Sequence, residues 1–268
     1  MEPNKTIAIL GARGRCGGAT MEAFHAAGWS VRAVVRPGSG WRPPWPEVEV
    51  READGMVADE LSPALRGCKV VFNGLNPPYW EWSEKAIPLA QSVIGAAVSA
   101  GVETHLFPGN VYNYGESIPE HCQPGMSFAP GPVRKARLRV EMERIFEEAS
   151  TRVQTIVLRA GDFYGYGWGS WMDLVVAKRL REGIMTYPGP MNVKHAWAFL
   201  PDLAATFVAI AERRAELSGY SERLFAGHAL TGQELQDAFE SVLARRLRVT
   251  SVPWFWMRLA RPFSPMLR

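Results

Sequence analysis

The sequence has few cysteines, no excess of charge of one sign and no long apolar run. Its three cysteines, Cys16, Cys68 and Cys122, are widely spaced and form no Cys-x-x-Cys pair, which argues against a disulfide-stapled fold and a zinc site. The 30 Lys and Arg exceed the 27 Asp and Glu by only three, too little to favour nucleic-acid binding. No stretch is long and apolar enough to span a bilayer, and no secretory signal is recognisable. We therefore expect a cytoplasmic protein, with 47% hydrophobic residues to build its core.

Short apolar runs alternate with helix-like segments over the first 165 residues. The strand-like runs share β-branched or alternating patterns and cover residues 5–10, 30–35, 47–51, 69–72, 104–107 and 154–158. Helical patterns cover residues 17–27, 59–66, 83–100 and 133–148, and Ser83 is expected to cap the third of these. This alternation predicts an α/β fold, a Rossmann-type doubly wound parallel sheet with helices on both faces.

After residue 165 the pattern changes. Glycines and aromatics cluster at 165–171, and helical patterns follow at 171–182, 202–213 and 232–246, the last of them opened by a capping box of Thr231 and Glu234. We predict a dinucleotide-binding domain at 1–165 and a small, mainly helical substrate-binding cap at 166–268, with some segments returning to the main domain. The aromatic and basic segment 252–268 is expected to dock on the core rather than to lie on a membrane surface.

A glycine-rich loop directly follows the first strand and opens a helix. Gly11, Gly14 and Gly17 form a Gly-x-x-Gly-x-x-Gly pattern, with Arg15 and Cys16 at the start of the helix. Glycines at these places allow a tight turn, a close approach of the backbone to a pyrophosphate and close packing of helix on strand. The helix N-terminus then presents free N–H groups to the phosphates. The loop therefore predicts a dinucleotide site.

The residue after the second strand indicates which dinucleotide binds. A carboxylate there would accept hydrogen bonds from a ribose 2′-hydroxyl, but this chain has Arg36, and Arg13 lies in the glycine loop. Two guanidinium groups would pair with a 2′-phosphate, which favours NADP, with NAD still possible. The alternative is that Arg36 is a solvated strand end.

Further motifs follow in order along the chain. They are Ala53-Asp54, Asn73-Gly74-Leu75, the segment from Asn110 through Tyr112 to Tyr114-Gly115, Arg134-Lys135, and the segment from Arg159 through Asp162 to Tyr164-Gly165. With the glycine loop, these make the chain resemble the extended and atypical branch of the short-chain dehydrogenase/reductase superfamily, the NAD-dependent epimerase/dehydratase-like proteins. The resemblance implies that Asp54 contacts adenine and that Asn73, Gly74 and Leu75 line the cofactor cleft.

The resemblance also implies a catalytic Tyr four residues before a Lys, and a Ser or Thr on the loop after strand five. Lys135 is present, where it would hold the nicotinamide ribose, but Gly131 stands at the tyrosine position and Asn110 at the Ser/Thr position. Asn110 can still donate a hydrogen bond to a substrate carbonyl. Tyr112, on the same loop, is our first candidate for the missing phenol.

The expected substrate lies between the sheet's carboxyl edge and the cap. The groups expected to line its site are polar or aromatic: Tyr79, Trp82, Asn110, Asp162, Tyr164, Trp168 and His195. His195 is either a proton-transfer group or a structural histidine. These side chains suit a ring, a sugar or a flat apolar molecule, and no metal site is expected.

Two functions remain open at this point. One is an NADP-dependent oxidoreductase or epimerase/dehydratase-like enzyme acting on a small carbonyl, sugar-like or nucleotide-sugar substrate. The other is a non-catalytic NADP(H)-binding redox sensor or regulatory protein, which the losses at Gly131 and Asn110 favour. We expect a small-molecule partner, no nucleic acid and no membrane, and leave a homodimer open.

Overall fold

The computed structural model describes residues 5–116 and 118–255, and the chain divides into two compact units. The first unit comprises Met1–Arg159 and Pro201–Phe225, and the second comprises Ala160–Leu200 and Ala226–Arg268. The segment Pro201–Phe225 thus belongs to the first unit, although it follows the expected boundary at residue 165. Most of the C-terminal segment expected to dock on the core, residues 256–268, lies outside the described residues.

The first unit is built on a seven-stranded sheet in the order β10-β6-β5-β4-β1-β2-β3, with every pairing parallel. The strands are β1 (Thr6–Leu10), β2 (Ser30–Val35), β3 (Glu49–Glu52), β4 (Val70–Asn73), β5 (Thr104–Gly109), β6 (Gln154–Arg159) and β10 (Tyr220–Leu224). The strand order reverses between β1 and β4, the place where open α/β sheets bind ligands beyond their carboxyl ends. The predicted Rossmann-type fold is confirmed.

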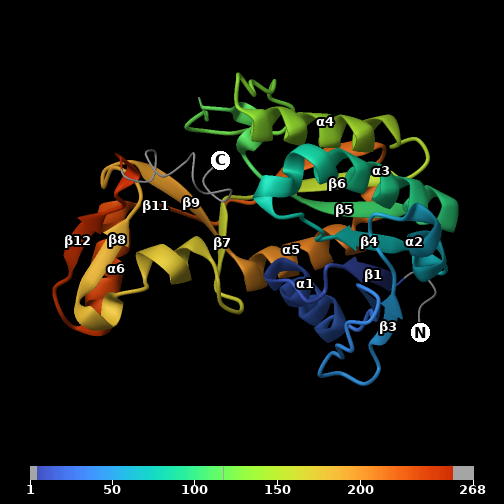
Figure 1. The fold of residues 1–268 in the computed structure, drawn as a ribbon, viewed down its shortest axis with the longest axis horizontal. Helices are drawn as coiled ribbons and strands as arrows, with labels where there is room; N and C mark the ends of the chain where they lie inside the picture. Colours follow the sequence, from blue (N-terminus) through green and yellow to red (C-terminus); the bar gives the residue numbers. More distant parts are fainter. Residues whose placement is uncertain (1–4, 117, 256–268) are drawn as a thin grey trace. The chain divides into compact units, whose positions relative to one another are not determined.

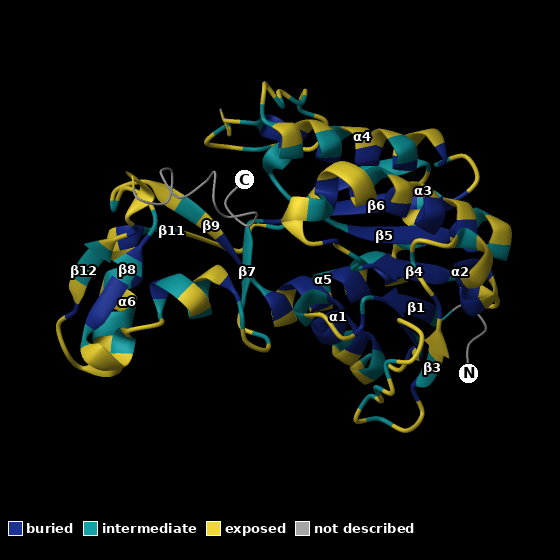
Figure 2. Ribbon diagram, viewed as in Figure 1, coloured by how far each residue is buried: buried dark blue, intermediate teal, exposed yellow. Residues whose placement is uncertain are grey.

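Helices cover both faces of this sheet (Figure 1). The helices α1 (Arg15–Ala26) and α5 (Leu200–Glu212) lie on one side, and α2 (Ala58–Leu65), α3 (Trp82–Ala100) and α4 (Arg134–Glu148) lie on the other. The central strands are almost wholly buried, as Figure 2 shows, because both of their faces are covered. The start of α3 differs from the prediction: its N-cap is Glu81, and Ser83 lies inside the helix.

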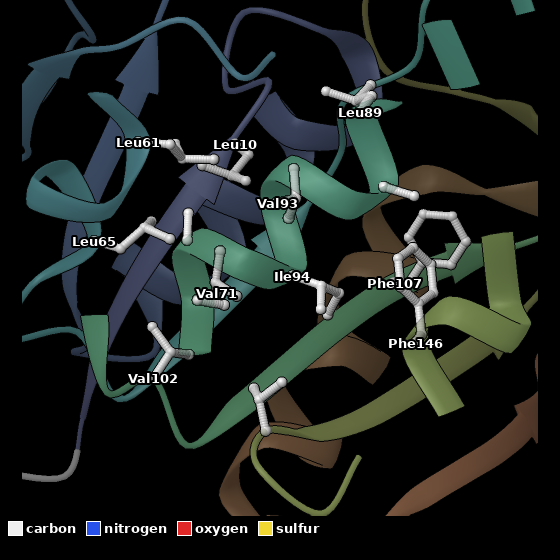
Figure 3. Packing of buried hydrophobic residues seen from close by; sticks show 14 of the residues in the cluster. Leu10, Leu61, Leu65, Val71, Leu89, Val93, Ile94, Val102, Phe107 and Phe146 are labelled. Carbon is white, nitrogen blue, oxygen red and sulfur yellow. The ribbon is translucent and has the colours of Figure 1, made fainter. Parts of the chain in front are cut away.

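Aromatic and branched side chains fill both interfaces between helices and sheet. On one face, Phe107 packs edge-on against Phe146 of α4, with ring centroids 4.9 Å apart (Figure 3). On the other face, Phe72 meets Phe207 of α5 at 5.0 Å. Because α5 follows the expected domain boundary, the segment after residue 200 completes the core of the first unit.

His105 is a titratable group inside this core. It is fully buried in β5, its ring centroid lies 4.8 Å from that of Phe146, and Nδ1 lies 3.2 Å from the Thr155 hydroxyl. Burial lowers the pKa of His105 from 6.5 to about 3. The folded protein therefore keeps this imidazole neutral throughout the mildly acidic range.

This burial predicts a loss of stability in mild acid. Below pH 6.5 the unfolded chain protonates His105 and the folded chain does not, so the free energy of unfolding falls by about 1.4 kcal/mol per pH unit toward pH 3. His105→Phe should remove this contribution, which urea unfolding at several pH values between 6.5 and 4.5 would show. His121→Gln, at an exposed position, should keep the wild-type slope. An unchanged slope in His105→Phe would contradict the prediction.

The second unit contains more strand than the sequence predicts. A three-stranded sheet is formed by β11 (His228–Thr231), β9 (Lys194–Phe199) and β7 (Asp162–Tyr164), and β12 (Arg248–Ser251) pairs with β8 (Ile184–Tyr187). This corrects the expectation of a mainly helical cap. These strands have at most six residues, so each gives only a short pattern. In β9 small and large side chains alternate, which is typical of a strand, but the stronger helical patterns on either side led to the prediction of a helical cap.

The helical part of the second unit is smaller than expected. The longest helix that lies wholly in it is α6 (Gly232–Leu243), which opens with the predicted capping box of Thr231 and Glu234. The predicted helix at 171–182 is a π-helical turn, Met172–Val176, and a 3₁₀ turn, Leu180–Glu182. Across residues 5–116 and 118–255, no helix has both the length and the apolar character of a membrane span.

Candidate functional site

The loop between β1 and α1 has a conformation that requires glycine. Gly11 adopts φ +77°, and a Cβ at this residue would lie 2.8 Å from the carbonyl oxygen of Gly74. A Cβ on Gly17 would lie 2.2 Å from the carbonyl oxygen of Gly11. The N–H of Gly14 donates to that same carbonyl at 2.8 Å and closes the turn. A larger residue at Gly11 or Gly17 would therefore push the loop away from β4 or from α1.

The N-terminus of α1 is uncapped by any side chain. Gly14 is its N-cap in an extended conformation, and the first turn contains no acidic residue. The free N–H groups of that turn are suited to an anionic ligand such as a pyrophosphate. Arg15 adds a donor, since its buried Nη1 has no hydrogen-bond partner among the described residues. Burial raises the pKa of Cys16 to about 12, so this thiol brings no negative charge to the loop. These features fit a dinucleotide.

Two exposed arginines lie beside this loop. Arg13 is within the loop, and Arg36 directly follows β2, whose Val34 is in register with Leu10 of β1. In the part of the chain that the structure describes, neither guanidinium is in an ion pair, so both are available to an anion. Asp54 follows β3 and accepts a hydrogen bond from the Met56 N–H at 2.9 Å, which ties its carboxylate to the turn before α2.

The residues after β4 lie opposite the glycine loop, at the place where the strand order of the sheet reverses. The N–H of Gly74 donates to the carbonyl of Leu10 at 3.0 Å, and the buried Asn73 accepts from the Leu75 N–H at 3.3 Å through Oδ1. A Cβ on Gly74 would lie 2.9 Å from the Leu10 carbonyl oxygen, so glycine keeps this segment against β1. The backbone of Asn73, Gly74 and Leu75 thus lies directly beside the glycine loop.

The position of the missing tyrosine lies outside the active-site helix. Gly131 is exposed, adopts φ +55°, and precedes the first residue of α4, Arg134, by three residues. Side chains rarely adopt this backbone conformation, so a tyrosine there would be strained. Lys135, in contrast, lies in the first turn of α4. The departure from the expected pattern is therefore one of backbone geometry as well as of residue type.

Two other phenols gather around Lys135. Tyr79 belongs to a 3₁₀ turn, Tyr79–Glu81, after β4, and Tyr112 to a second one, Tyr112–Tyr114, after β5. Their hydroxyl oxygens are 3.3 Å apart, and the Lys135 Nζ lies 4.4 Å from the centroid of the Tyr79 ring. Asn110 shapes the second turn, because its Oδ1 accepts from the Tyr112 N–H at 3.0 Å and leaves its Nδ2 group as the donor for a substrate oxygen.

Trp82 and Arg139 support these tyrosines from the buried side. The Trp82 ring lies 5.0 Å from that of Tyr79 and 6.4 Å from that of Tyr112, and its Nε1 donates to the Pro77 carbonyl at 3.0 Å. The Arg139 guanidinium lies 5.1 Å from the Trp82 ring, and its buried Nε has no hydrogen-bond partner among the described residues. Burial lowers the pKa of Arg139, while the nearby carboxylate of Glu143 opposes that shift.

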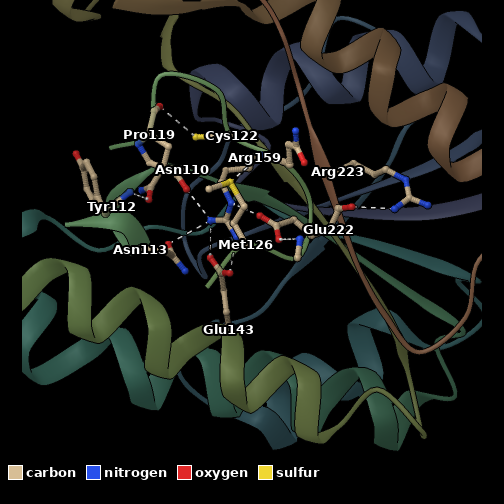
Figure 4. A network of polar contacts seen from close by, with 12 residues as sticks. Asn110, Tyr112, Asn113, Pro119, Cys122, Met126, Glu143, Arg159, Glu222 and Arg223 are labelled. Carbon is tan, nitrogen blue, oxygen red and sulfur yellow. Dashed lines mark hydrogen bonds and ion pairs between the residues drawn. The ribbon is translucent and has the colours of Figure 1, made fainter. Parts of the chain in front are cut away.

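A buried ion network anchors the loop that carries Tyr112 (Figure 4). Arg159, at the end of β6, donates to Glu143 at 2.9 Å, to Glu222 at 2.5 Å and to the Asn110 carbonyl at 2.6 Å. Burial disfavours the charge of Arg159, but bonding to the two carboxylates outweighs this and raises its pKa. In Figure 4 the Tyr112 side chain points away from Arg159. The network thus fixes the backbone of the loop at Asn110, while the Tyr112 phenol takes no part in it.

The predicted substrate-binding residues fall in both units. Tyr79, Trp82 and Asn110 lie in the first unit, and Asp162, Tyr164, Trp168 and His195 lie in the second. Within the second unit, His195 Nε2 is 3.0 Å from the Asp162 carboxylate, and the His195 ring lies 4.4 Å from that of Trp197.

The sheet of the second unit carries a further polar pair that sequence reasoning missed. Tyr164 Oη lies 3.0 Å from Nδ1 of His228, so β7 and β11 together present a phenol and an imidazole. Trp168 does not belong to this pair, and its side chain is 77% exposed. No sequence signal marks His228, whereas the spacing of four between Lys135, Arg139 and Glu143 could have shown that these three share one side of α4. The described residues contain no group of three or more side chains suited to a metal ion.

Comparison with known proteins identifies the family and the fold. Residues 3–260 match the NmrA-like family. The chain belongs to this family. No curated protein matches the NmrA-like chain, but many solved structures do.

Three examples among these structures are described as epimerases or putative epimerases. A putative epimerase from Burkholderia cenocepacia J2315 has a TM-score of 0.76 at 19% identity, over 94% of this chain and 84% of that one. UDP-N-acetylglucosamine 4-epimerase from Bacillus cereus has a TM-score of 0.75 at 16% identity, over 92% and 84%. UDP-glucose-4-epimerase from Stenotrophomonas maltophila, with bound NAD and formylated UDP-arabinopyranose, has a TM-score of 0.76 at 15% identity, over 93% and 86%. The NmrA-like chain thus shares the fold of these epimerases, and the resemblance to the extended short-chain dehydrogenase/reductase superfamily is confirmed at the level of the fold.

Proposed function

We propose that this NmrA-like protein is an NADP(H)-dependent oxidoreductase or epimerase/dehydratase-like enzyme that acts on a small carbonyl, sugar-like or nucleotide-sugar substrate. The observation that carries the proposal is the pair of phenols beside Lys135, in the unit that also contains the glycine loop. The nicotinamide would supply or accept the hydride. The chain supplies a hydrogen-bond donor from Asn110, a proton from Tyr112 and a cation from Lys135.

The polar residues of the second unit suit the recognition of a hydroxylated ring. Asp162 and His195 offer an acceptor and a donor side by side, and the partly exposed Tyr164 supplies aromatic surface, with the buried Trp197 packed against the rings of His195 and Tyr164. Aromatic faces bordered by such polar groups are a common composition for small-molecule sites. The nucleotide sugars bound by structural neighbours support this substrate class.

NADP is the preferred cofactor in this proposal. Arg13 and Arg36 are unpaired with acidic residues in the described chain and lie beside the loop that would receive the pyrophosphate. Both can donate to a 2′-phosphate. Structural neighbours with a bound dinucleotide hold NAD, so the preference for NADP rests on the two arginines and not on the structural similarity.

Replacing Arg36 tests the preference. Arg36→Asp should weaken NADPH binding about tenfold to a hundredfold, the cost of about 1.5–3 kcal/mol for losing a charge-assisted hydrogen bond, and it should improve NADH binding. Calorimetric titration with both dinucleotides measures the change. Arg66→Asp is the matched control, because this exposed arginine follows α2 at the amino edge of the sheet. Equal affinities of the wild type for NADPH and NADH would refute the role of the arginines.

A non-catalytic NADP(H) sensor is the second candidate, supported by Gly131, whose φ of +55° disfavours a tyrosine at the position where the resemblance implies the catalytic one. Following NADPH absorbance over a panel of ketones, aldehydes and UDP-sugars separates the two. Turnover of any member supports the enzyme. Tight NADPH binding without turnover of any member supports the sensor.

A further inference from the structure

The hydrogen bond between Tyr79 and Tyr112 joins a sheltered phenol to an exposed one. Tyr112 is partly buried and packs against the core, whereas Tyr79 is 46% exposed. Their oxygen–oxygen distance of 3.3 Å is longer than the usual 2.7–2.8 Å, as is common for catalytic hydrogen bonds before a ligand is bound. Tyr79 thus gives the Tyr112 hydroxyl a hydrogen-bonded route for exchanging protons with water.

The surroundings of this pair are strongly biased toward positive charge. Lys135 lies over the Tyr79 ring, and the buried Arg139 stacks on Trp82 between the two tyrosines and the core. Two acids on the same elements are already engaged, since Glu143 binds Arg159 at 2.9 Å and Glu81 pairs with Lys85 at 2.6 Å. Two cations beside two phenols stabilise negative charge that develops on either oxygen during a proton transfer.

We propose that Tyr79 and Tyr112 form a two-phenol proton relay that replaces the missing helix tyrosine, an inference that rests on the proposed function. In the reducing direction, the Tyr112 O–H bond breaks as an O–H bond forms on the substrate oxygen. The Tyr79 proton moves to Tyr112, and Tyr79 recovers a proton from water. In the oxidising direction the same protons move in reverse. In this relay Tyr79 acts on the substrate oxygen through Tyr112.

The first test concerns the pair itself and needs no turnover. In protein labelled with ¹³Cζ-tyrosine, Tyr79→Phe should shift the Tyr112 Cζ resonance, and Tyr112→Phe should shift that of Tyr79. Trp80→Phe is the control, because Trp80 is an exposed aromatic in the same 3₁₀ turn. Absence of the reciprocal shifts, with the fold intact, would overturn the relay.

The second test concerns proton transfer during turnover of NADPH and the best substrate of the panel. Tyr79→Phe should lower kcat about tenfold without changing KM, and the double variant should be no slower than Tyr112→Phe, because the two groups act in series. The rate in mixtures of H₂O and D₂O should depend on two protons in the wild type and on one in Tyr79→Phe.

The outcomes separate the relay from the proposed function. Full activity of Tyr79→Phe alongside wild-type turnover would overturn the relay and leave the enzyme assignment intact. Reciprocal resonance shifts in the two variants, combined with a wild type that turns over no substrate, would overturn both the enzyme assignment and the relay.

Discussion

Tyr112→Phe is expected to lower kcat by about a hundredfold or more, the usual scale of general acid–base help. The substitution removes only a hydroxyl, and that hydroxyl lies 3.3 Å from Tyr79, which Lys135 covers. Affinity for NADPH should stay unchanged, because the proposed cofactor contacts lie in the glycine loop, the ends of β2 and β4, and Lys135. Steady-state rates and calorimetric titration measure the two quantities.

Tyr114→Phe is the matched control for this variant. Tyr114 lies in the same 3₁₀ turn, is 1% exposed, and its hydroxyl has no hydrogen-bond partner among the described residues. Its removal should leave kcat within about twofold of the wild type, since no interaction is lost. Equal rates for wild type and Tyr112→Phe would redirect attention to Tyr79, Tyr164 and His195 as the proton donor.

Arg159→Met is expected to destabilise the protein by about 3–5 kcal/mol, the cost of leaving buried charges without their partner. Glu143 and Glu222 would both lose their cation, and the Asn110 carbonyl would lose its donor. Urea unfolding at pH 7 measures the difference in free energy. Because the loop that carries Tyr112 loses its anchor, activity should fall as well.

Arg144→Met supplies a control on the same helix as Glu143. Arg144 forms an exposed ion pair with Glu148 at 2.5 Å, and such pairs contribute about 0–1 kcal/mol. Adding Glu143→Gln and Glu222→Gln to Arg159→Met should recover part of the lost stability, because neutral amides cost less to bury than carboxylates. If Arg159→Met lowered the free energy of unfolding no more than Arg144→Met does, the buried ion network would not contribute to stability as predicted.

The sequence could predict most of the first unit because local patterns there agree with the final structure. The strands β1, β2, β4, β5 and β6 are apolar and lie between recognisable helices, so their parallel pairing follows. The strand β10 escaped prediction because it is an edge strand of the sequence Tyr-Ser-Glu-Arg-Leu, without an apolar pattern. In the second unit the strands are short, and their pairing partners are distant in the chain.

The candidate site could be predicted only in part. Motif order led to the glycine loop, to Lys135 and to the loop with Tyr112, since each follows a recognisable strand or starts a helix. The hydrogen bond between Tyr79 and Tyr112 depends on how two loops turn, which no pattern encodes. Arg139 was visible only as one of several basic residues on α4, and its burial becomes apparent when Trp82 packs over it.

The interleaving of the two units affects how the protein can be made and cut. The chain passes from one unit to the other after Arg159, after Leu200 and after Phe225. During synthesis, the first unit is incomplete until residue 225 has left the ribosome, because Phe207 and β10 belong to it. No single cleavage separates the units as intact pieces. A dinucleotide-binding fragment would have to be rebuilt by joining residue 159 to residue 201 with a short linker that replaces the excised segment.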